Sequence, residues 1–408
     1  VLVLTFKPAV LSAWREDLLS HSDFAGWQFV SNKEEDLSFA NVDKTRPLVC
    51  FGSFQDYLGK DKSGGIKPKN EWVHTTNWDC VIFDEYHYGA WRDKSKDLFK
   101  DEKGWKDKES WEAIERIKKE LRDIEAEENG SGKKDLIDSF DDFDEEMLPI
   151  TTNHYLYLSG TPFRAILSGE FIEEQIFNWT YPDEQKAKME WNPENGSNPY
   201  AALPRMKMFT YTLPESIRAI AEQGEFNEFD LNVFFAAEGK EDKARFKHEE
   251  YVQKWLDLIR GSYRNTFVDD LKLGKEKPPM PFSDVRLLGV LQHTFWYLPN
   301  VAACFAMKNL MMQKQNRFYH DYDIIVCAGS AAGIGVDALT PVQEAMGNGL
   351  DTKTITLSCG KLTTGVSVPP WSGVLMLRNS SSPETYFQTA FRVQTPWVLK
   401  NPAADAGQ

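Results

Sequence analysis

The chain has 408 residues, of which 41% are hydrophobic and 27% are charged, and its formal net charge is −15. At about 150 residues per domain, this length predicts two or three domains. The composition is that of a folded globular protein and excludes extensive disorder. The negative charge argues against a uniformly basic surface for nucleic acid. However, residues 93–150 hold 20 acidic and 12 basic residues, a net charge of −8, so about half of the excess lies in one segment.

The sequence predicts neither a membrane span nor a cysteine-based metal site. The longest apolar stretch, residues 287–312, is interrupted by polar residues and a proline, which makes it a poor transmembrane helix. The first four residues form an apolar run without a basic leader, so we expect a cytoplasmic protein. The cysteines have no C-x-x-C spacing, which favours buried free thiols over a metal site: Cys50, Cys80, Cys304, Cys327 and Cys359.

In chain order, short apolar runs alternate with a helix-like stretch in the first part of the sequence. The runs at residues 1–4, 48–51, 80–83 and 155–158 are predicted strands, and 9–19 is a predicted helix. Each run ends in small, polar or charged residues. This pattern is typical of an α/β fold with a parallel, doubly wound sheet, in which ligands bind at the carboxyl ends of the strands.

The charged segment, residues 93–150, is predicted to be an insertion on the first domain. It contains a helical pattern at 111–128 and then an Asn-Gly-Ser-Gly turn, and a solvated helical hairpin is a simpler interpretation than a partner-binding surface. Residues 171–281 combine several prolines with an amphipathic stretch at 246–259, which predicts a mostly helical connecting region.

A second alternation fills the last third of the chain, with a predicted helix at 301–312 and predicted strands at 324–328, 354–358 and 374–377. The predicted organisation is therefore one α/β domain over residues 1–170, the connecting region over 171–281, and a second α/β domain over 282–408.

Two adjacent carboxylates, Asp84 and Glu85, follow a predicted buried strand in the segment V-I-F-D-E-Y-H at 81–87. There one carboxylate can hold Mg²⁺ while the other orients or deprotonates a water; the alternative is an ordinary strand end. The segment resembles the D-E-x-H box, or Walker B motif, of superfamily 2 helicases. The resemblance implies that Asp84 binds Mg²⁺ through water, Glu85 is the catalytic base, and His87 links the nucleotide site to the nucleic acid. Residues 88–92 look like the helicase subunits of restriction enzymes, type III subunits among them.

The sequence S-G-T-P at 159–162 comes directly after another predicted strand. Alone it is an ordinary turn, but its hydroxyls can pass on hydrogen bonds when a neighbouring site changes charge. It resembles motif III of the same helicases. The resemblance implies that Ser159 and Thr161 couple the nucleotide state to the nucleic acid.

Two further strand ends are candidates for contact with the nucleic-acid backbone. V-L-V-L-T-F-K-P at 1–8 resembles motif Ia of these helicases, which implies Thr5 and Lys7 as backbone contacts. V-C-F-G-S-F-Q at 49–55 is the next candidate, with Ser53 and Gln55, and a structural turn is the alternative.

In the second domain, residues 361–369 resemble motif V. The resemblance implies Thr364 as a nucleic-acid contact and Gly365 as a coupling residue. Family members commonly have an acidic residue near the position of Ser367, and its absence leaves a ribose contact in question.

Residues 386–395 resemble motif VI, in which arginines reach across the cleft to the γ-phosphate. The resemblance implies catalytic roles for Gln388 and for Arg392 as the arginine finger. Thr395 stands at the position of a second finger, so only one is expected.

The order of these segments implies two RecA-like domains that couple hydrolysis of ATP, with Mg²⁺, to movement on DNA, with RNA left open as an alternative track. The restriction-enzyme resemblance implies methyltransferase, specificity or nuclease domains or subunits as partners. A metal-dependent nuclease that uses Asp84 and Glu85 is a weaker alternative, because no P-D-x-n-[DE]-x-K cluster supports it.

The sequence lacks the G-x-x-x-x-G-K-[ST] loop that cradles nucleotide phosphates in such motors. Residues 59–65 have its composition without its spacing, and 329–335 lack its lysine. In the family this loop precedes motif Ia, so we expect a fragment that hydrolyses little or no ATP. The alternative is a non-catalytic nucleic-acid-binding or scaffold protein that retains the fold. A gene that encodes the loop upstream and in phase would favour the motor.

The 13 tryptophans and 26 phenylalanines offer surfaces for base stacking, although most are expected in the core. Two tryptophans, Trp91 and Trp371, are expected on exposed turns.

Overall fold

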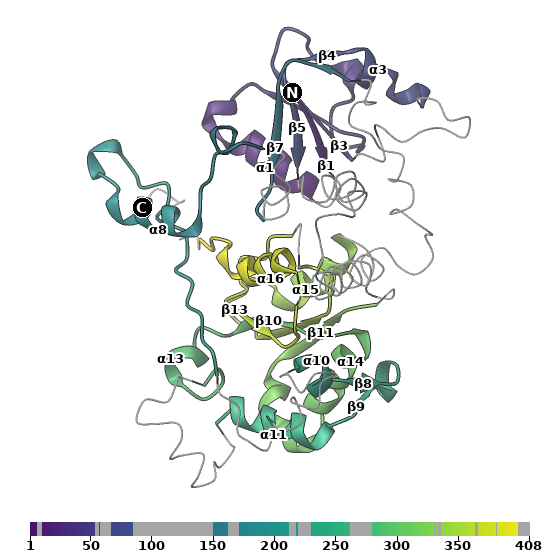
Figure 1. Cartoon of the computed structure of the whole chain (residues 1–408), viewed down its shortest axis with the longest axis vertical. Helices are drawn as coiled ribbons and strands as arrows, with labels where there is room; N and C mark the ends of the chain where they lie inside the picture. The colour runs from purple at the N-terminus through teal and green to yellow at the C-terminus, as the bar shows by residue number, and fades with distance from the viewer. Residues whose placement is uncertain are drawn as a thin grey trace, which may run out of the picture. The chain divides into compact units, whose positions relative to one another are not determined.

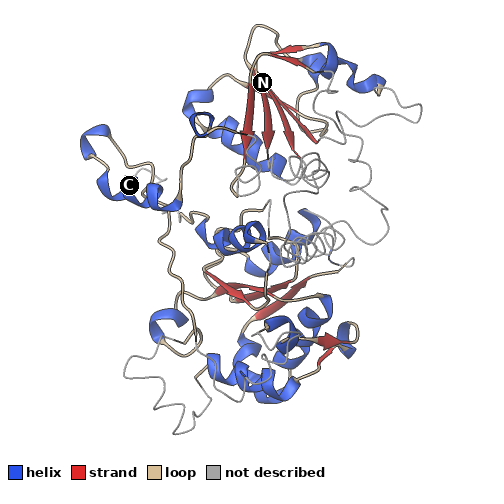
Figure 2. Ribbon diagram, viewed as in Figure 1, coloured by secondary structure: helices blue, strands red, loops and turns tan. Residues whose placement is uncertain are grey.

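The computed structural model describes residues 1–5, 10–53, 57, 67–84, 150–161, 171–211, 218, 230–261, 280–329, 332, 336–363, 366–380 and 382–398. They form two compact units, the first ending at Ile176 and the second beginning at Phe177. Each unit is built around a parallel sheet (Figures 1 and 2). The predicted α/β class with parallel sheets is confirmed.

The first unit contains a five-stranded parallel sheet in the order β2-β3-β1-β5-β7. Its strands are β1 Leu2–Thr5, β2 Gln28–Val30, β3 Leu48–Ser53, β5 Val81–Asp84 and β7 Tyr155–Leu158. Four of them agree with the predicted runs to within two residues. The edge strand β2 was not predicted, because three residues are too few to show a pattern.

Both faces of the sheet are covered at the strands β1 and β3, which explains why these strands are continuous apolar runs, whereas Tyr155 and Leu156 of the edge strand β7 are exposed. Successive residues of a strand point to opposite faces. Val3 packs with Leu18 from helix α1 (Leu11–Ser20), whereas its neighbours Leu2 and Leu4 pack with Val73 from helix α3 (Glu71–Thr75). The remaining short elements of the unit are η2 Ser22–Phe24, η3 Phe39–Asn41, η4 Pro68–Asn70, η6 Glu173–Gln175, and the parallel pair β4 Asn77–Trp78 and β6 Thr151–Thr152.

A glycine in β3 allows an aromatic ring to lie directly on the strand. Tyr57 is 1% exposed, and its hydroxyl donates a hydrogen bond of 3.0 Å to the carbonyl of Phe51. A Cβ atom on Gly52 would lie within 2.6 Å of the ring carbon Cζ of Tyr57. This close approach requires glycine at position 52. The hydrogen bond to Phe51 holds the Tyr57 ring against β3.

The second unit contains a four-stranded parallel sheet in the order β11-β12-β10-β13. Its strands are β10 His293–Tyr297, β11 Asp323–Cys327, β12 Thr354–Ser358 and β13 Gly373–Met376. Three of them agree with the predicted strands to within one residue. The inner strand β10 was missed, because it is buried on both faces and lies within the long apolar stretch 287–312, where Pro299 and Asn300 separate it from α14 but were interpreted only as interruptions of that stretch.

His293 begins β10 and is 1% exposed. Its Nε2 faces the carbonyl of Gly349 at 2.9 Å, and its Nδ1 faces the hydroxyl of Thr354 at 2.9 Å. A carbonyl can only accept, so Nε2 carries the proton and Nδ1 accepts from Thr354. Burial lowers the pKa of His293, and the hydrogen bond to Gly349 opposes this only in part. The ring is therefore a neutral link between β10, β12 and the turn before β12.

Helices cover both faces of the second sheet. On one face, Met307 of α14 (Val301–Met311) and Leu256 of α11 (Glu249–Ile259) share a core with Trp296. On the other, Val342 of α15 (Val336–Met346) packs in a cluster with Phe295. The other elements of the unit are α8 Tyr181–Glu190, α10 Leu231–Phe234, α13 Val285–Leu288, α16 Pro383–Ala390, η7 Pro193–Asn195, η8 Glu241–Lys243, η9 Lys314–Asp321, η11 Phe391–Gln394, and the antiparallel pair β8 Ala237–Glu238 and β9 Arg245–Phe246.

The expectation that Trp371 lies on an exposed turn is wrong. Its side chain is 2% exposed, and its ring centroid lies 4.9 Å from that of Phe295. The apolar face of a large indole is more stable in this core than in water.

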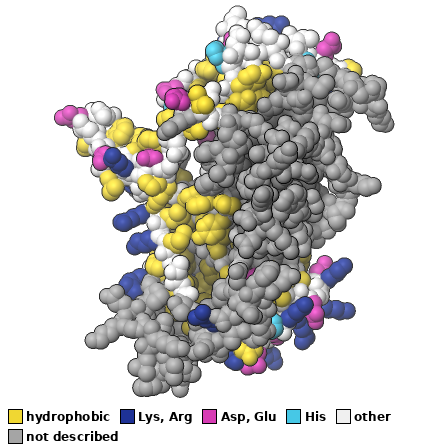
Figure 3. Space-filling view, viewed as in Figure 1, with side chains coloured by type: hydrophobic (Ala, Val, Ile, Leu, Met, Phe, Trp, Pro, Cys, Tyr) yellow, Lys and Arg dark blue, Asp and Glu magenta, His cyan; other side chains and the backbone are white. Residues whose placement is uncertain are grey.

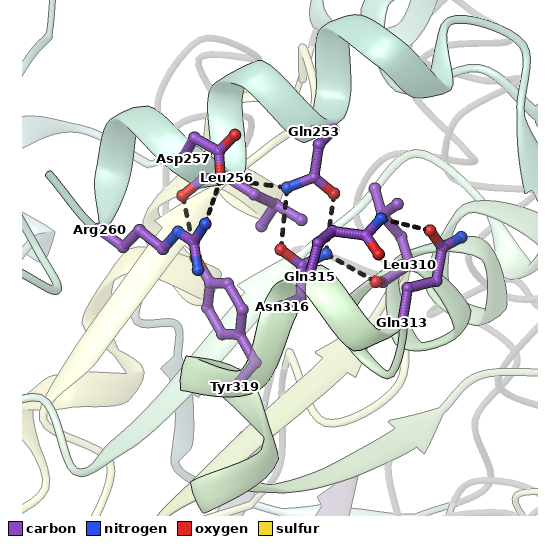
Figure 4. Close-up of polar contacts among 9 residues, drawn as sticks. All are labelled: Gln253, Leu256, Asp257, Arg260, Leu310, Gln313, Gln315, Asn316 and Tyr319. Carbon is purple, nitrogen blue, oxygen red and sulfur yellow. Dashed lines mark hydrogen bonds and ion pairs between the residues drawn. The ribbon is translucent and has the colours of Figure 1, made fainter. Parts of the chain in front are cut away.

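A polar network joins α11 to the rest of the second unit (Figure 4). Gln253 and Asn316 exchange two amide hydrogen bonds of 2.8 Å each, and Asn316 also donates to the carbonyl of Leu310 at 2.8 Å. The hydroxyl of Tyr319 donates to the carbonyl of Leu256 at 3.2 Å. The second half of the predicted connecting region therefore packs on the second sheet through both a shared apolar core and buried polar contacts.

The segment around α8 is held together by its own contacts. A capping box between Thr180 and Asp183 begins the helix, and Lys188 donates to the carbonyl of Leu203 at 2.5 Å. Phe177 and Met189 of this segment are 88% and 79% exposed. In Figure 3, hydrophobic side chains in the region of α8 are interspersed with charged ones.

All five cysteines are free, and Cys50, Cys304, Cys327 and Cys359 are buried. Burial raises the pKa of both Cys50 and Cys327 to about 12, so these thiols are protonated and inert. In the described part of the chain, no helix is both long and apolar enough to cross a bilayer.

Candidate functional site

The predicted site residues of the first unit converge at one edge of its sheet. The register pairs Thr5 with Ser53 on one side and with Asp84 on the other, and Asp84 with Leu158. Ser159 follows directly. Segments from four distant parts of the sequence therefore end in one row, because parallel strands present their carboxyl ends at the same edge.

The hydroxyl side chains in this row are enclosed. Thr5 and Ser53 are 0% and 3% exposed, and Thr161 is 2% exposed. The backbone N–H of Thr161 donates to the hydroxyl oxygen of Ser159 at 3.2 Å, which closes a tight serine turn after β7. Rigid strands and this turn fix the polar groups at the edge.

Asp84 is half-buried at the last position of β5. The indole N–H of Trp14, on α1, donates to its Oδ2 atom at 2.9 Å. No local pattern in the sequence indicates this contact, because the two residues are 70 positions apart. Trp14 therefore joins the candidate site only through the tertiary structure.

The chemistry of this edge fits Mg²⁺. A carboxylate oxygen is the ligand that Mg²⁺ prefers. Among the described residues no three His, Cys, Asp or Glu side chains gather as a metal cage. Mg²⁺ sites in nucleotide-dependent enzymes commonly use one or two carboxylates together with waters and substrate phosphates, so Asp84 is a sufficient anchor from this strand.

In the second unit, the two segments that resemble motifs V and VI are in contact. Arg392, which follows α16, donates from Nη1 to the carbonyl of Val366 and from Nε to the carbonyl of Gln388 at 3.0 Å. Both predicted catalytic residues of the second unit therefore lie together, and a carbonyl of the motif V segment orients the guanidinium.

Two further cations lie in the chain that follows strands β12 and β13. Arg378 donates to the carbonyl of Cys359 at 3.0 Å and lies over the ring of Tyr297 at 5.0 Å. Lys361 is 2% exposed, and its carbonyl accepts a hydrogen bond of 2.6 Å from Ser358. Neither residue was predicted as a site residue. Each lies within three residues of the end of a predicted strand, and this position could have identified them.

Several predicted site residues lie outside the described residues, and their placement is not described: Lys7, Gln55, Glu85, His87, Thr364 and Gly365. The same holds for Trp91 and for all of the predicted insertion except Ile150.

No family model matches the chain. A Mycoplasma pneumoniae protein is 28% identical to it over 428 aligned residues, which include 98% of this chain and 55% of the relative. The chain therefore spans about half the length of that relative. Over almost all of its own length, this chain is similar to a protein whose name proposes that it is the C-terminus of a type II restriction enzyme and methyltransferase.

Proposed function

We propose that this chain belongs to a restriction system and forms the motor core of an ATP-dependent DNA translocase or helicase of superfamily 2, with two RecA-like domains. One observation carries the proposal: candidate residues from four distant segments align at the carboxyl edge of a single parallel sheet. The similarity to a protein named as a restriction enzyme and methyltransferase supports the restriction system, DNA as the track, and methyltransferase or nuclease regions as partners.

In this proposal Asp84 holds Mg²⁺ through water, and Glu85 acts as the base that orients the attacking water. The metal, when bound, neutralises charge on the nucleotide phosphates. His87, Ser159 and Thr161 relay the change in nucleotide state. Serine and threonine suit this role, because a hydroxyl can donate and accept without changing its own charge.

In the second unit, Arg392 supplies positive charge to the γ-phosphate, and Gln388 lies one helical turn before it. The Val366 and Gln388 carbonyls support this role, because they fix the plane of the guanidinium before the nucleotide arrives. Thr364 and Gly365 belong to the same motif V segment and are proposed as its nucleic-acid contact and coupling residue.

For the nucleic-acid contact, burial divides the candidates by role. Thr5 and Ser53 are almost completely buried, so we assign them to fixing the strand ends. Lys7 and Gln55 come two residues later in each segment, and we assign them the contact with the backbone phosphates.

The test is DNA-stimulated hydrolysis of ATP by the longest natural polypeptide that contains this sequence. We expect turnover that rises with DNA and falls at least 100-fold in D84N and in R392A, since each removes charge stabilisation of the transition state. The matched control is R286A, which removes an exposed arginine paired only locally with Asp284. The 408-residue chain itself is expected to show little or no turnover, and rapid turnover by it would contradict that expectation.

The second candidate is a non-catalytic nucleic-acid-binding scaffold. The absence of a G-x-x-x-x-G-K-[ST] sequence from the chain favours it. If the natural polypeptide binds DNA but neither binds nor hydrolyses ATP, this candidate replaces the motor.

A further inference from the structure

We propose that Trp14 is a positioning residue for the metal site: its indole N–H holds the carboxylate of Asp84 in the orientation that binds Mg²⁺. This inference rests on the proposed function, because it takes Asp84 to be the metal ligand. It adds a residue outside the segments that resemble helicase motifs.

The position of Trp14 is set by packing. It lies on α1, which carries Leu18 into the core cluster formed with Val3 and Phe51. The indole centroid lies 6.4 Å from the ring of Phe51, at an interplanar angle of 43°. A ring held against two strands has little freedom to rotate, so its N–H remains directed toward the end of β5.

The chemistry of the contact suits a supporting role. Indole has one donor and no acceptor, so it can bind a carboxylate but cannot ligate a metal. Its hydrogen bond to Oδ2 restrains the plane of the carboxylate. Partners of this kind that orient a ligand typically change metal affinity by about 10- to 100-fold when they are removed.

The simpler interpretation is that Trp14 only fills the core and that its N–H finds the nearest acceptor. The substitution W14F separates the two possibilities, because it retains an aromatic ring in the core and removes the donor. A packing role predicts a change in stability alone. A positioning role predicts a change in metal binding at unchanged fold.

The experiment is a titration of the 408-residue chain with Mn²⁺ as the probe for Mg²⁺, alone and together with ATP. Free Mn²⁺ is counted by electron paramagnetic resonance, and the indole N–H signals are followed by ¹H–¹⁵N NMR. The Trp14 signal is assigned in the wild-type protein by sequential NMR assignment, and its loss in W14F confirms the assignment where that variant folds. The control is W179F, which alters an exposed tryptophan of the second unit.

We expect wild-type protein and W179F to bind Mn²⁺ equally, with strong broadening of the Trp14 signal, and D84N to lose both effects. W14F is expected to bind Mn²⁺ about 10-fold more weakly while its other indole signals stay in place. Equal affinity in W14F and wild-type protein, with D84N impaired, would overturn the role of Trp14 and leave the proposed function standing. Equal affinity in D84N and wild-type protein would overturn both. If the indole signals show that W14F is unfolded, absence of Mn²⁺-induced broadening of the wild-type Trp14 signal decides against the inference, and its presence decides in favour.

Discussion

Replacing Gly52 by alanine is expected to destabilise the first unit. The added Cβ would lie within 2.6 Å of the Tyr57 ring, whereas ordinary contacts between carbon atoms are about 3.5–4.0 Å. The ring would have to move by roughly 1 Å, yet it is 1% exposed and tied by its hydroxyl to Phe51.

The sign of the effect identifies its cause. Glycine in a strand is intrinsically less stable than alanine by about 0.5–1 kcal/mol, so without a clash G52A would stabilise the protein. Overpacking of a core costs about 1–3 kcal/mol, which exceeds this gain. We therefore expect net destabilisation of about 1 kcal/mol, taken as the difference between the midpoints of these two ranges.

Urea unfolding followed by tryptophan fluorescence measures this change as a lower midpoint of the transition that reports on the first unit. The control is G160A, because nothing lies within 4 Å of a Cβ on Gly160. The decisive measurement is the double mutant. In the Y57A variant the space above Gly52 is open, so adding G52A is expected to leave the free energy of unfolding unchanged or to raise it. An equal cost of G52A with and without the Tyr57 ring would refute the reasoning.

Three other predictions concern the second unit. Burial lowers the pKa of His293 in the folded state, so the unfolded chain binds more protons below about pH 6.5. The free energy of unfolding should therefore fall as the pH drops below that value and level off below the folded pKa. Unfolding measured across pH should show a smaller fall in H293Q. Asn316→Ala and Gln253→Ala should each lower the free energy of unfolding by about 1–3 kcal/mol, because the partner amide loses its hydrogen bonds. The double mutant should lose less than the sum of the two single changes, and additive changes in a double-mutant cycle would rule out the paired hydrogen bonds. Thr180→Ala should weaken the capping box by about 1 kcal/mol, seen as roughly fivefold faster hydrogen exchange within α8 and unchanged exchange in α11.

The strands that sequence reasoning identified are those with a sharp change of composition at each end. β5 and β7 stand out because apolar runs stop at Asp84 and Ser159, and β12 because it stops at a polar serine. β10 has a weaker signal, since Gln292 before it and Pro299 and Asn300 after it are brief interruptions in a stretch that becomes apolar again in α14. Local pattern identifies an element only where its surroundings differ from it.

Of the candidate site, the sequence located Asp84, Ser159 and Arg392 at the ends of elements, where exposed chemistry is expected. It did not show that Thr5 and Ser53 are buried, which changes their proposed role from contact to support. Burial depends on which strands become neighbours, and strand order cannot be inferred from the sequence of any single segment.

The sequence by itself determined the α/β class, most of the strands, and the rule that reactive side chains stand at their carboxyl ends, because these follow from hydrophobic patterns within ten or so residues. Only the tertiary structure decided that β1 lies between β3 and β5, that Trp14 reaches Asp84, and that Arg392 is held by Val366. The last two contacts join residues 70 and 26 positions apart, respectively. They arise because distant helices and strands bury their apolar faces against one another in a shared core, and a local sequence pattern does not specify which elements will pack together.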